Sequence, residues 1–430
     1  MRHLRGKESL KATDQRTLLL LAVCAFASAA SMRICDPLLP VLAGEFDTSL
    51  SAAAATTTGF ALAYGATQLF FGPLGDRVGR LPVIVVAITI AAAASAASAL
   101  APTLNLLVAA RIATGAFAAA AIPLSLGWIG DNVPFAERQP VLARYLIGQM
   151  LGMTAGQIGG GVLADLIGWR FAFWLIAALF STAAFLLHRS MRQAAAEARA
   201  DALAASSASA GSPRAARLAA PVPSGGFIRQ CRLLAADRWA TIVIGTVTLE
   251  GILLFGAVAL IASYLQRTFG VSPSVAGTVS ALFGLGGMFY ALNARRLLAR
   301  LRGPGLCRMG GGLIALAMVV LILQPSWQPA IAATLMAGLG YYMLHNTLQT
   351  QATQLSTEAR GAAIAWFATG LWLGQGIGVS AAAVIAERFG FPVVFAGTAL
   401  SLAILGLVFS RALEARDASL QAAKQSGTAA

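Results

Sequence analysis

An arginine and an aspartate stand three residues apart in the stretch SMRICDPLLP, residues 31–40, inside a long apolar run. Arg33 and Asp36 lie one helical turn apart, so they can form an ion pair. A charge deep in a membrane span costs about 2.5–3.5 kcal/mol on insertion scales, so such residues usually face the protein interior and mark an ion or substrate path. Pro37 and Pro40 lack a backbone N–H and are expected to break the helix and free carbonyls. We expect Asp36 to exchange protons; a static pair that fixes helix packing is the alternative.

Other polar residues are predicted to lie inside the membrane. Arg111 is expected at about the depth of Asp36, roughly 10 Å from the outer surface at ~1.5 Å per helical residue, and is a second candidate partner for that carboxylate. Glu250 has no basic residue nearby in sequence, so it is a candidate second proton site or partner for a cationic substrate. A neutral, hydrogen-bonded glutamate is the alternative. The candidates for lining a substrate cavity are Gln68, Gln149, His345, Asn346, Trp372 and Gln375.

The composition is that of a helical membrane protein. The 430 residues are 58% hydrophobic and 11% charged, with a mean hydropathy of +0.74, whereas soluble domains are about a quarter charged. Backbone groups in lipid must be paired internally, and long apolar runs without period-two alternation favour helices over a barrel. The net charge of +14 is spread over alternate loops, without a basic face bearing aromatics, so we expect no nucleic-acid binding.

We predict an all-α membrane fold of twelve transmembrane helices in two pseudo-symmetric six-helix bundles. Each predicted span has roughly the 20 residues that cross the hydrocarbon core. The spans are 17–43, 50–71, 81–101, 104–130, 141–165, 170–188, 239–264, 273–294, 305–324, 329–351, 361–386 and 390–411. The predicted domains are an N-terminal segment, an N-terminal bundle, a linker, a C-terminal bundle and a tail, at 1–16, 17–188, 189–238, 239–411 and 412–430.

The charges of the loops predict the orientation. Both terminal segments and the linker are basic, whereas the opposite loops carry almost no lysine or arginine, so both termini and the linker are expected in the cytoplasm. The linker has eight arginines against three acids and is expected to be partly helical at 192–205. Lysine is nearly absent, which is typical of a GC-rich genome, so we expect a bacterial inner membrane. The apolar run continues past a signal-like start, so we expect no cleavage.

The two halves repeat at an offset of 222 residues. The matching pairs are Arg138 and Arg360, Gly148 and Gly370, Gly152 and Gly374, Gly156 and Gly378, Asp165 and Glu387, Gly168 and Gly390, and Phe173 and Phe395. The fifth and eleventh spans therefore look like copies. Repeated halves are the construction of secondary transporters, whose substrate site lies between the halves near the midplane. The glycine stripes admit close helix packing; a gating role and simple packing both remain open.

A glycine-rich charged motif, GPLGDRVGR, joins the second and third spans. Its glycines allow a tight turn, and its arginines can pair with an acid at a neighbouring helix end, for which Asp131 is the candidate. The motif resembles the loop between these spans in the major facilitator superfamily, where it is a conformational latch. The resemblance carries that role to Gly72, Asp76, Arg77, Gly79 and Arg80. An ordinary charged turn is the alternative, and the equivalent loop of the second half lacks the aspartate.

Two more stretches resemble a branch of that superfamily. The run DPLLPVLAGEF is similar to the end of the first span in drug/proton antiporters of the bicyclomycin-resistance type, where an aspartate precedes a leucine–proline pair. The RIATG stretch that holds Arg111 resembles the arginine signature of the fourth span, which is linked to proton transfer. The stripe of the fifth span resembles the antiporter signature, but Gly156 is followed by Gln157 where that signature has proline.

We therefore expect a secondary active transporter that couples proton entry at Asp36 to efflux of small amphipathic molecules, drug-like compounds or a secreted metabolite such as a siderophore. A proton symporter or facilitator that imports a nutrient, and a non-transporting sensor, are the alternatives. Sequences of the types HExxH, GxSxG and GxxxxGKS do not occur, so we expect neither an enzyme nor direct ATP drive. The expected partners are lipid, the substrate and protons, in a monomer without cofactor or metal.

Overall fold

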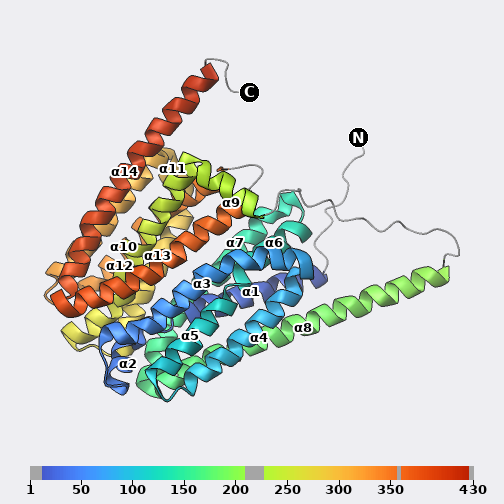
Figure 1. The fold of residues 1–430 in the computed structure, drawn as a ribbon, viewed down its shortest axis with the longest axis horizontal. Helices are drawn as coiled ribbons and strands as arrows, with labels where there is room; N and C mark the ends of the chain where they lie inside the picture. The colour runs from blue at the N-terminus through green and yellow to red at the C-terminus, as the bar shows by residue number, and fades with distance from the viewer. Residues whose placement is uncertain (1–11, 209–226, 356–359, 426–430) are drawn as a thin grey trace.

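A computed structural model describes residues 12–208, 227–355 and 360–425 (Figure 1). Parts of the predicted N-terminal segment, linker and tail lie outside the described residues. The described part of the chain is helical and contains no strand. The first half consists of α1 (Ala12–Arg33), the 3₁₀ helix η1 (Asp36–Leu38), α2 (Leu39–Glu45), α3 (Leu50–Val78), α4 (Arg80–Ala99), α5 (Leu104–Ala118), α6 (Ala121–Asn132), α7 (Phe135–Leu166) and α8 (Trp169–Ala208).

The second half repeats this succession of long helices. It consists of α9 (Phe227–Ala236), α10 (Arg238–Phe269), α11 (Pro273–Leu323), α12 (Pro329–Ala352), α13 (Arg360–Phe389) and α14 (Phe391–Gln425). Every predicted span falls on these helices. The eighth and ninth spans both lie in α11, which is interrupted at Arg302, where φ is 54° and ψ is 178°.

Prolines and backbone breaks divide two other spans. The first span consists of α1, η1 and α2, and the break lies at Asp36–Leu38, where the proline pair predicted it. The fourth span is divided into α5 and α6. The helix expected at 192–205 is a continuation of α8, which runs on to Ala208. In Figure 1, α8 and α14 project beyond the other helices, away from the end of the molecule that holds α2.

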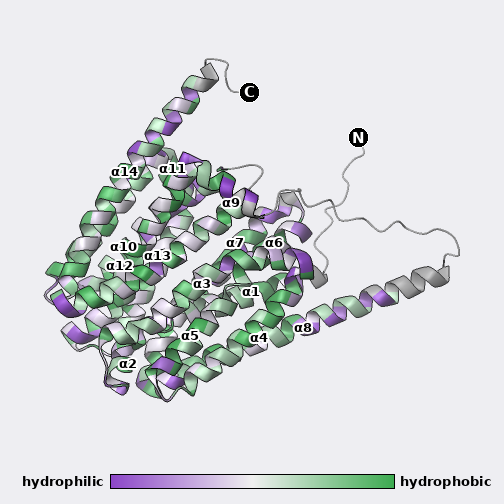
Figure 2. Cartoon of the chain, viewed as in Figure 1, coloured by the Kyte–Doolittle hydropathy of each residue, from purple (hydrophilic) through white to green (hydrophobic). Residues whose placement is uncertain are grey.

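The helices present apolar surface along most of their length. Eight segments of the described chain are long and apolar enough to cross a membrane, by length and composition. Figure 2 shows hydrophobic residues along both groups of helices and hydrophilic residues at the helix ends and on the projecting parts of α8 and α14. This distribution fits helices that stand in a bilayer with their ends in water.

Glycines bring the fifth helix of each half against the first. A Cβ on Gly152 or Gly156 of α7 would overlap the carbonyl of Phe26 or Ala30 in α1. In the second half, a Cβ on Gly374 or Gly378 of α13 would overlap a backbone carbonyl of α10. The predicted glycine stripes therefore serve close helix packing in both halves.

The repeat is also present in the ends of these helices. Gly168 follows α7 with a φ of +102°, and Gly390 follows α13 with a φ of +88°, a conformation that only glycine adopts without strain. Five residues beyond each glycine, Phe173 and Phe395 are both fully buried. The halves meet through α3 against α13 and α7 against α11. The break at η1 contacts α10 and α11 of the second half, so it lies beside the interface between the halves.

Candidate functional site

Asp36 and Arg33 form a buried ion pair at the helix break. The Arg33 Nη1 atom lies 3.3 Å from Asp36 Oδ2, and both side chains are 1% exposed. The same oxygen accepts a hydrogen bond of 3.3 Å from Nε2 of Gln157 in α7. Asp36 Oδ1 and Arg33 Nη2 are buried without a hydrogen-bond partner. The pair therefore keeps one free acceptor and one free donor in a dry interior, where each is unstable without a ligand, a proton or water.

Arg33 also reaches the other half of the molecule. Its guanidinium carbon lies 4.6 Å from the centre of the Phe255 ring in α10, a cation–π contact. Close by, Gln266 of α10 donates a hydrogen bond of 2.9 Å to the carbonyl of Pro37. The prediction that the prolines leave carbonyls free is confirmed for Pro37, and the acceptor is used by the opposite half.

Arg111, the other candidate partner of Asp36, makes no ion pair with it in this structure, although the two charges lie close enough to interact electrostatically. Its Nη1 and Nη2 atoms donate to the hydroxyl and the carbonyl oxygen of Ser31, at 3.2 and 2.8 Å. The guanidinium lies 4.3 Å from the ring centre of Phe60. Depth in the span was estimated from sequence, but the direction in which the side chain leaves its helix decides the partner.

Glu250, which has no basic residue nearby in sequence, has a partner from a distant helix. Its Oε2 atom lies 2.7 Å from Nδ1 of His345 in α12, and the glutamate is fully buried. The second carboxylate oxygen, Oε1, has no hydrogen-bond partner. The His345 ring stacks on Tyr341 at 4.8 Å. The second half thus holds its own buried acid–base pair, which α10 and α12 bring together from 95 residues apart.

The candidate amides differ in their surroundings. Gln375 is fully buried, and neither its oxygen nor its nitrogen has a hydrogen-bond partner. Gln68 is buried with an unpartnered oxygen. Gln149 and Asn346 are half-buried. Unsatisfied buried amides are rare in folded proteins, so Gln375 and Gln68 are the stronger candidates for contact with a ligand or water.

Aromatic rings connect the two halves beside the buried charged side chains. Trp372 of α13 contacts Tyr64 of α3 edge-on at 5.3 Å and lies 6.5 Å from Phe255. Phe255 in turn contacts Tyr341, at 5.2 Å. Tyr64 itself stacks on Phe60, the ring beneath Arg111. The buried charges of both halves therefore lie against one continuous group of rings, a surface suited to the apolar part of an amphipathic molecule.

Gln157 is the residue that sequence reasoning did not assign to the site. The sequence alone marks it only as a departure from the proline of the antiporter signature. In the structure it binds Asp36 and lines a small internal cavity between α7 and α11, together with Arg33, Thr154, Phe283 and Tyr342. The available signal was its place between Gly156 and Gly160, two glycines whose Cβ positions meet Ala30 and Ile34 of the first span.

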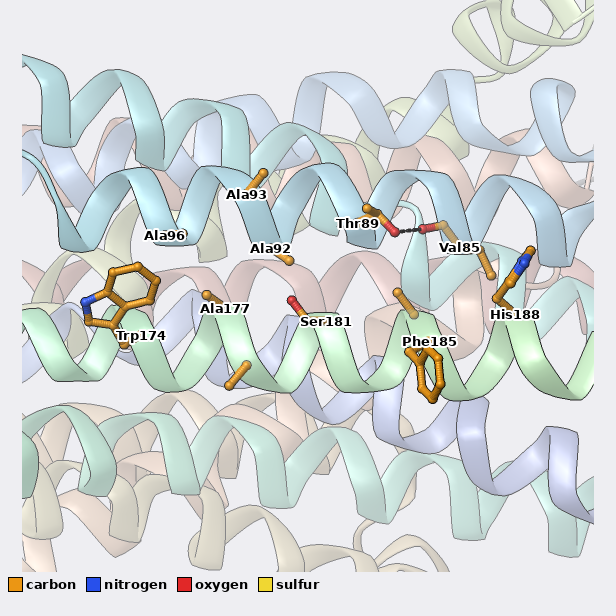
Figure 3. Close-up of a pocket in the computed structure, with 12 residues that line it drawn as sticks. Val85, Thr89, Ala92, Ala93, Ala96, Trp174, Ala177, Ser181, Phe185 and His188 are labelled. Atoms are coloured by element: carbon orange, nitrogen blue, oxygen red, sulfur yellow. Dashed lines mark hydrogen bonds between the residues drawn. The ribbon is translucent and has the colours of Figure 1, made fainter.

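A larger groove lies away from these charges. It runs between α4 and α8 and is lined mostly by small and aromatic residues, among them Ala92, Ala96, Trp174 and Phe185 (Figure 3). Thr89 hydrogen-bonds its own helix there, to the carbonyl of Val85. The groove has no buried charge and lies on the outer flank of the first half, so it is not the candidate site.

Arg80 makes the ion pairs of the predicted latch motif. Its Nη2 lies 3.1 Å from Oδ1 of Asp76, and its Nε lies 3.0 Å from Oδ2 of Asp131. The predicted partner Asp131 is therefore confirmed for Arg80. A Cβ on Gly127 of α6 would collide with the Arg80 guanidinium, so this glycine makes the space that the arginine occupies. Among the described residues Arg77 makes no ion pair, in contrast to the prediction.

The turn in this motif is shorter than expected. Helix α3 continues through Gly72 and Gly75 to Val78, and α4 begins at Arg80. Gly79 alone makes the turn, with a φ of +100°. Gly75 lies against Leu124 of α6, whereas nothing lies within 4 Å of a Cβ on Gly72.

Comparison with solved structures shows the same fold in a known transporter. A bacterial homologue of the human lysosomal transporter Spinster, solved in an inward-facing and unoccupied conformation, superposes with a TM-score of 0.70 over 94% of this chain and 96% of that one, at 18% sequence identity. The fold predicted from the sequence, an all-α membrane protein of two six-helix bundles, is confirmed by this likeness.

Curated relatives match about two fifths of the chain. A putative uncharacterized transporter of Escherichia coli K12, YgaY, is 30% identical over 179 residues, 41% of this chain and 44% of that protein. The efflux pump radE of Floropilus chiversii is 27% identical over 37% of this chain and 30% of its own length. Citrate exporter 1 of Aspergillus niger is 29% identical over 36% of this chain and 30% of its own length. The matched part thus spans less than half of each relative.

A family model described as Major Facilitator Superfamily matches residues 21–356 and 243–429 of this chain. The two matched ranges together cover the described helices from α1 to α14, including both buried pairs and the Arg80 motif. The chain therefore belongs to the Major Facilitator Superfamily and is a membrane transporter of that type.

Proposed function

We propose that this transporter exports small amphipathic molecules in exchange for protons by alternating access, with Asp36 as the proton site. The observation that carries the proposal is the Asp36–Arg33 pair, 1% exposed at a helix break beside the interface between the halves. In this buried carboxylate Oδ1 has no hydrogen-bond partner and is open to a proton, whereas Oδ2 holds the contacts with Arg33 and Gln157. The relatives that are named as an efflux pump and as an exporter support this direction.

Arg33 is the element that couples the proton to the movement of the halves. With Asp36 charged, the guanidinium is held between the carboxylate of the first half and the Phe255 ring of the second. Protonation of Asp36 removes the attraction between opposite charges, so Arg33 keeps at most a hydrogen bond to a neutral carboxyl group. Arg33 is then free to leave Asp36, and the contact between the halves rearranges.

The test replaces the proton site without changing its shape. Asp36→Asn should abolish gradient-driven efflux while the protein stays folded, because an amide cannot be ionised. Cells that express either form are profiled for resistance to a panel of toxic amphipathic compounds and for ethidium efflux, with and without a protonophore. Glu45→Gln is the matched control, because this exposed carboxylate pairs with Arg170 on the surface. Undiminished, protonophore-sensitive efflux by the Asp36→Asn variant would remove Asp36 from the mechanism.

Import is the second candidate, and Gln157 favours it, since it stands where the antiporter signature has proline. The two candidates are separated by the direction of movement of a compound identified in the resistance panel. Inverted membrane vesicles with an acidic interior accumulate the substrate of an exporter and are depleted of that of a symporter. Absence of any flux in proteoliposomes would instead favour a sensor.

A further inference from the structure

Two carboxylates join the halves at the end of the molecule that holds α2. Asp165 lies at the end of α7, and its Oδ2 accepts a hydrogen bond of 2.8 Å from the backbone N–H of Ser274 in α11. Glu387 lies at the end of α13, and its Oε1 accepts one of 3.0 Å from the backbone N–H of Ser51 in α3. Each contact crosses from one half to the other.

The two contacts are copies of each other in detail. Both donors are the second residue of their helix, and each helix has a serine N-cap, Ser49 for α3 and Ser272 for α11. The two acceptors, Asp165 and Glu387, occupy equivalent positions in the 222-residue repeat. A hydroxyl adds to each contact: that of Ser51 donates to Glu387, and that of Ser274 lies 3.5 Å from the carbonyl of Gly161.

Electrostatics explain why these acids would be placed here. A negative side chain near the C-terminus of its own helix is unfavourable, because that end of the helix dipole is negative. Each carboxylate lies in the last turn of its own helix and is offset by the positive N-terminal end of a helix from the opposite half. The contact between the halves therefore stabilises both acids at this end, and Arg267, of the same half as Glu387, adds a favourable charge near that carboxylate.

We propose that Asp165 and Glu387 are paired gate residues that hold this end of the transporter closed. Both side chains are exposed, so water replaces the contacts when the halves separate and each contact is weak enough to break in a transport cycle. The halves are in close backbone contact beneath Asp165, where a Cβ on Gly161 would overlap the Pro273 carbonyl. The proposal rests on alternating access but not on the proton site.

The test measures the separation of the halves directly. Spin labels at N105C in α5 and T268C in α10, both exposed near this end, report its opening by pulsed electron double resonance in nanodiscs. The four native cysteines are replaced by alanine, and neither substrate nor gradient is present. D165N and E387Q should each raise the ratio of open to closed forms about threefold, and the double variant about ninefold, as expected for independent contacts of exposed charges with helix ends.

The donor side supplies a second variant. S274P removes the N–H that Asp165 accepts from, at a position in the first helical turn where proline is tolerated. It should open this end at least as much as D165N does, because the hydroxyl near the Gly161 carbonyl is lost as well, and the D165N/S274P double variant should open no further than S274P alone. E45Q is the matched control, because it removes a carboxylate at the same end whose partner, Arg170, belongs to the same half.

The outcome that overturns the proposal is an unchanged distance distribution in the folded D165N/E387Q protein, or a shift of equal size in E45Q. Because the measurement uses neither substrate nor pH gradient, this result leaves the assignment of Asp36 untouched. Conversely, efflux that survives Asp36→Asn removes the proton site and leaves the gate standing.

Discussion

Several charged side chains of this protein are buried inside the helix bundles. Glu250 is fully buried, and its pairing with His345 satisfies only one of its two oxygens. Breaking a buried pair by removing one partner typically costs about 3–5 kcal/mol, because the other charge is left uncompensated. The pair in the second half therefore has measurable consequences for stability, whatever its role in transport.

We predict strong coupling between Glu250 and His345. The losses of unfolding free energy in Glu250→Gln and His345→Leu should together exceed the loss in the double variant by a coupling energy of about 1–3 kcal/mol. Chemical denaturation of the purified protein in detergent measures it. The same cycle on Arg308 and Glu414, an ion pair of 3.0 Å that is nearly half exposed, is the control and should give less than about 1 kcal/mol. Equal coupling in the two cycles would contradict this account of Glu250.

At the level of helices, α7 combines packing and chemistry on neighbouring positions. Its glycines admit the backbone of α1, and the close approach brings Gln157 within hydrogen-bond distance of Asp36. A side chain added at a contact glycine must move one helix away from the other, so the effect should extend from stability to the site.

We expect Gly156→Ala to destabilise the protein by about 1–3 kcal/mol, because the new methyl group would overlap the Ala30 carbonyl. Gly159→Ala, three residues further along the same helix, is the matched control. Nothing lies within 4 Å of a Cβ there, so this change should be neutral or stabilise by up to ~1 kcal/mol through helix propensity. Thermal unfolding of the two purified variants decides; equal melting temperatures would refute the packing assignment.

The Arg80 motif connects three helices, α3, α4 and α6. Arg80→Gln removes both ion pairs at once and should reduce transport with little loss of stability, because the pairs are partly exposed. Arg77→Gln removes the same charge from a residue that makes no ion pair among the described residues, and it should have the smaller effect. Efflux rates at matched expression levels provide the measurement, and an equal loss in both variants would argue against the Arg80 pairs as the latch.

Across the whole molecule, the internal repeat organises the middle of the helices and the end that holds α2. The fifth helix of each half packs on the first through glycines, ends in a glycine of positive φ, and reaches the opposite half with an acid. The buried charges do not follow the repeat: the first half pairs Asp36 with Arg33 on one segment, and the second pairs residues of two helices. The repeat therefore organises the helix packing and the contacts between the halves, and the departures from it lie at the candidate chemical site.

Hydropathy, glycine spacing and proline positions are local properties of a chain, and by themselves they determined the helical membrane fold, the positions of the spans, the break at Asp36 and the repeat of the halves. The ion pair between Arg33 and Asp36 was also predictable, because three residues of helix bring them together.

Only the tertiary structure decided which distant side chains meet. Arg111 lies at a suitable depth for Asp36 but binds Ser31, and Glu250 acquires His345 from a helix far along the chain. Such pairings depend on the rotation of each helix about its axis and on its tilt. These are set by packing over the whole interface, which no local spacing in a sequence specifies.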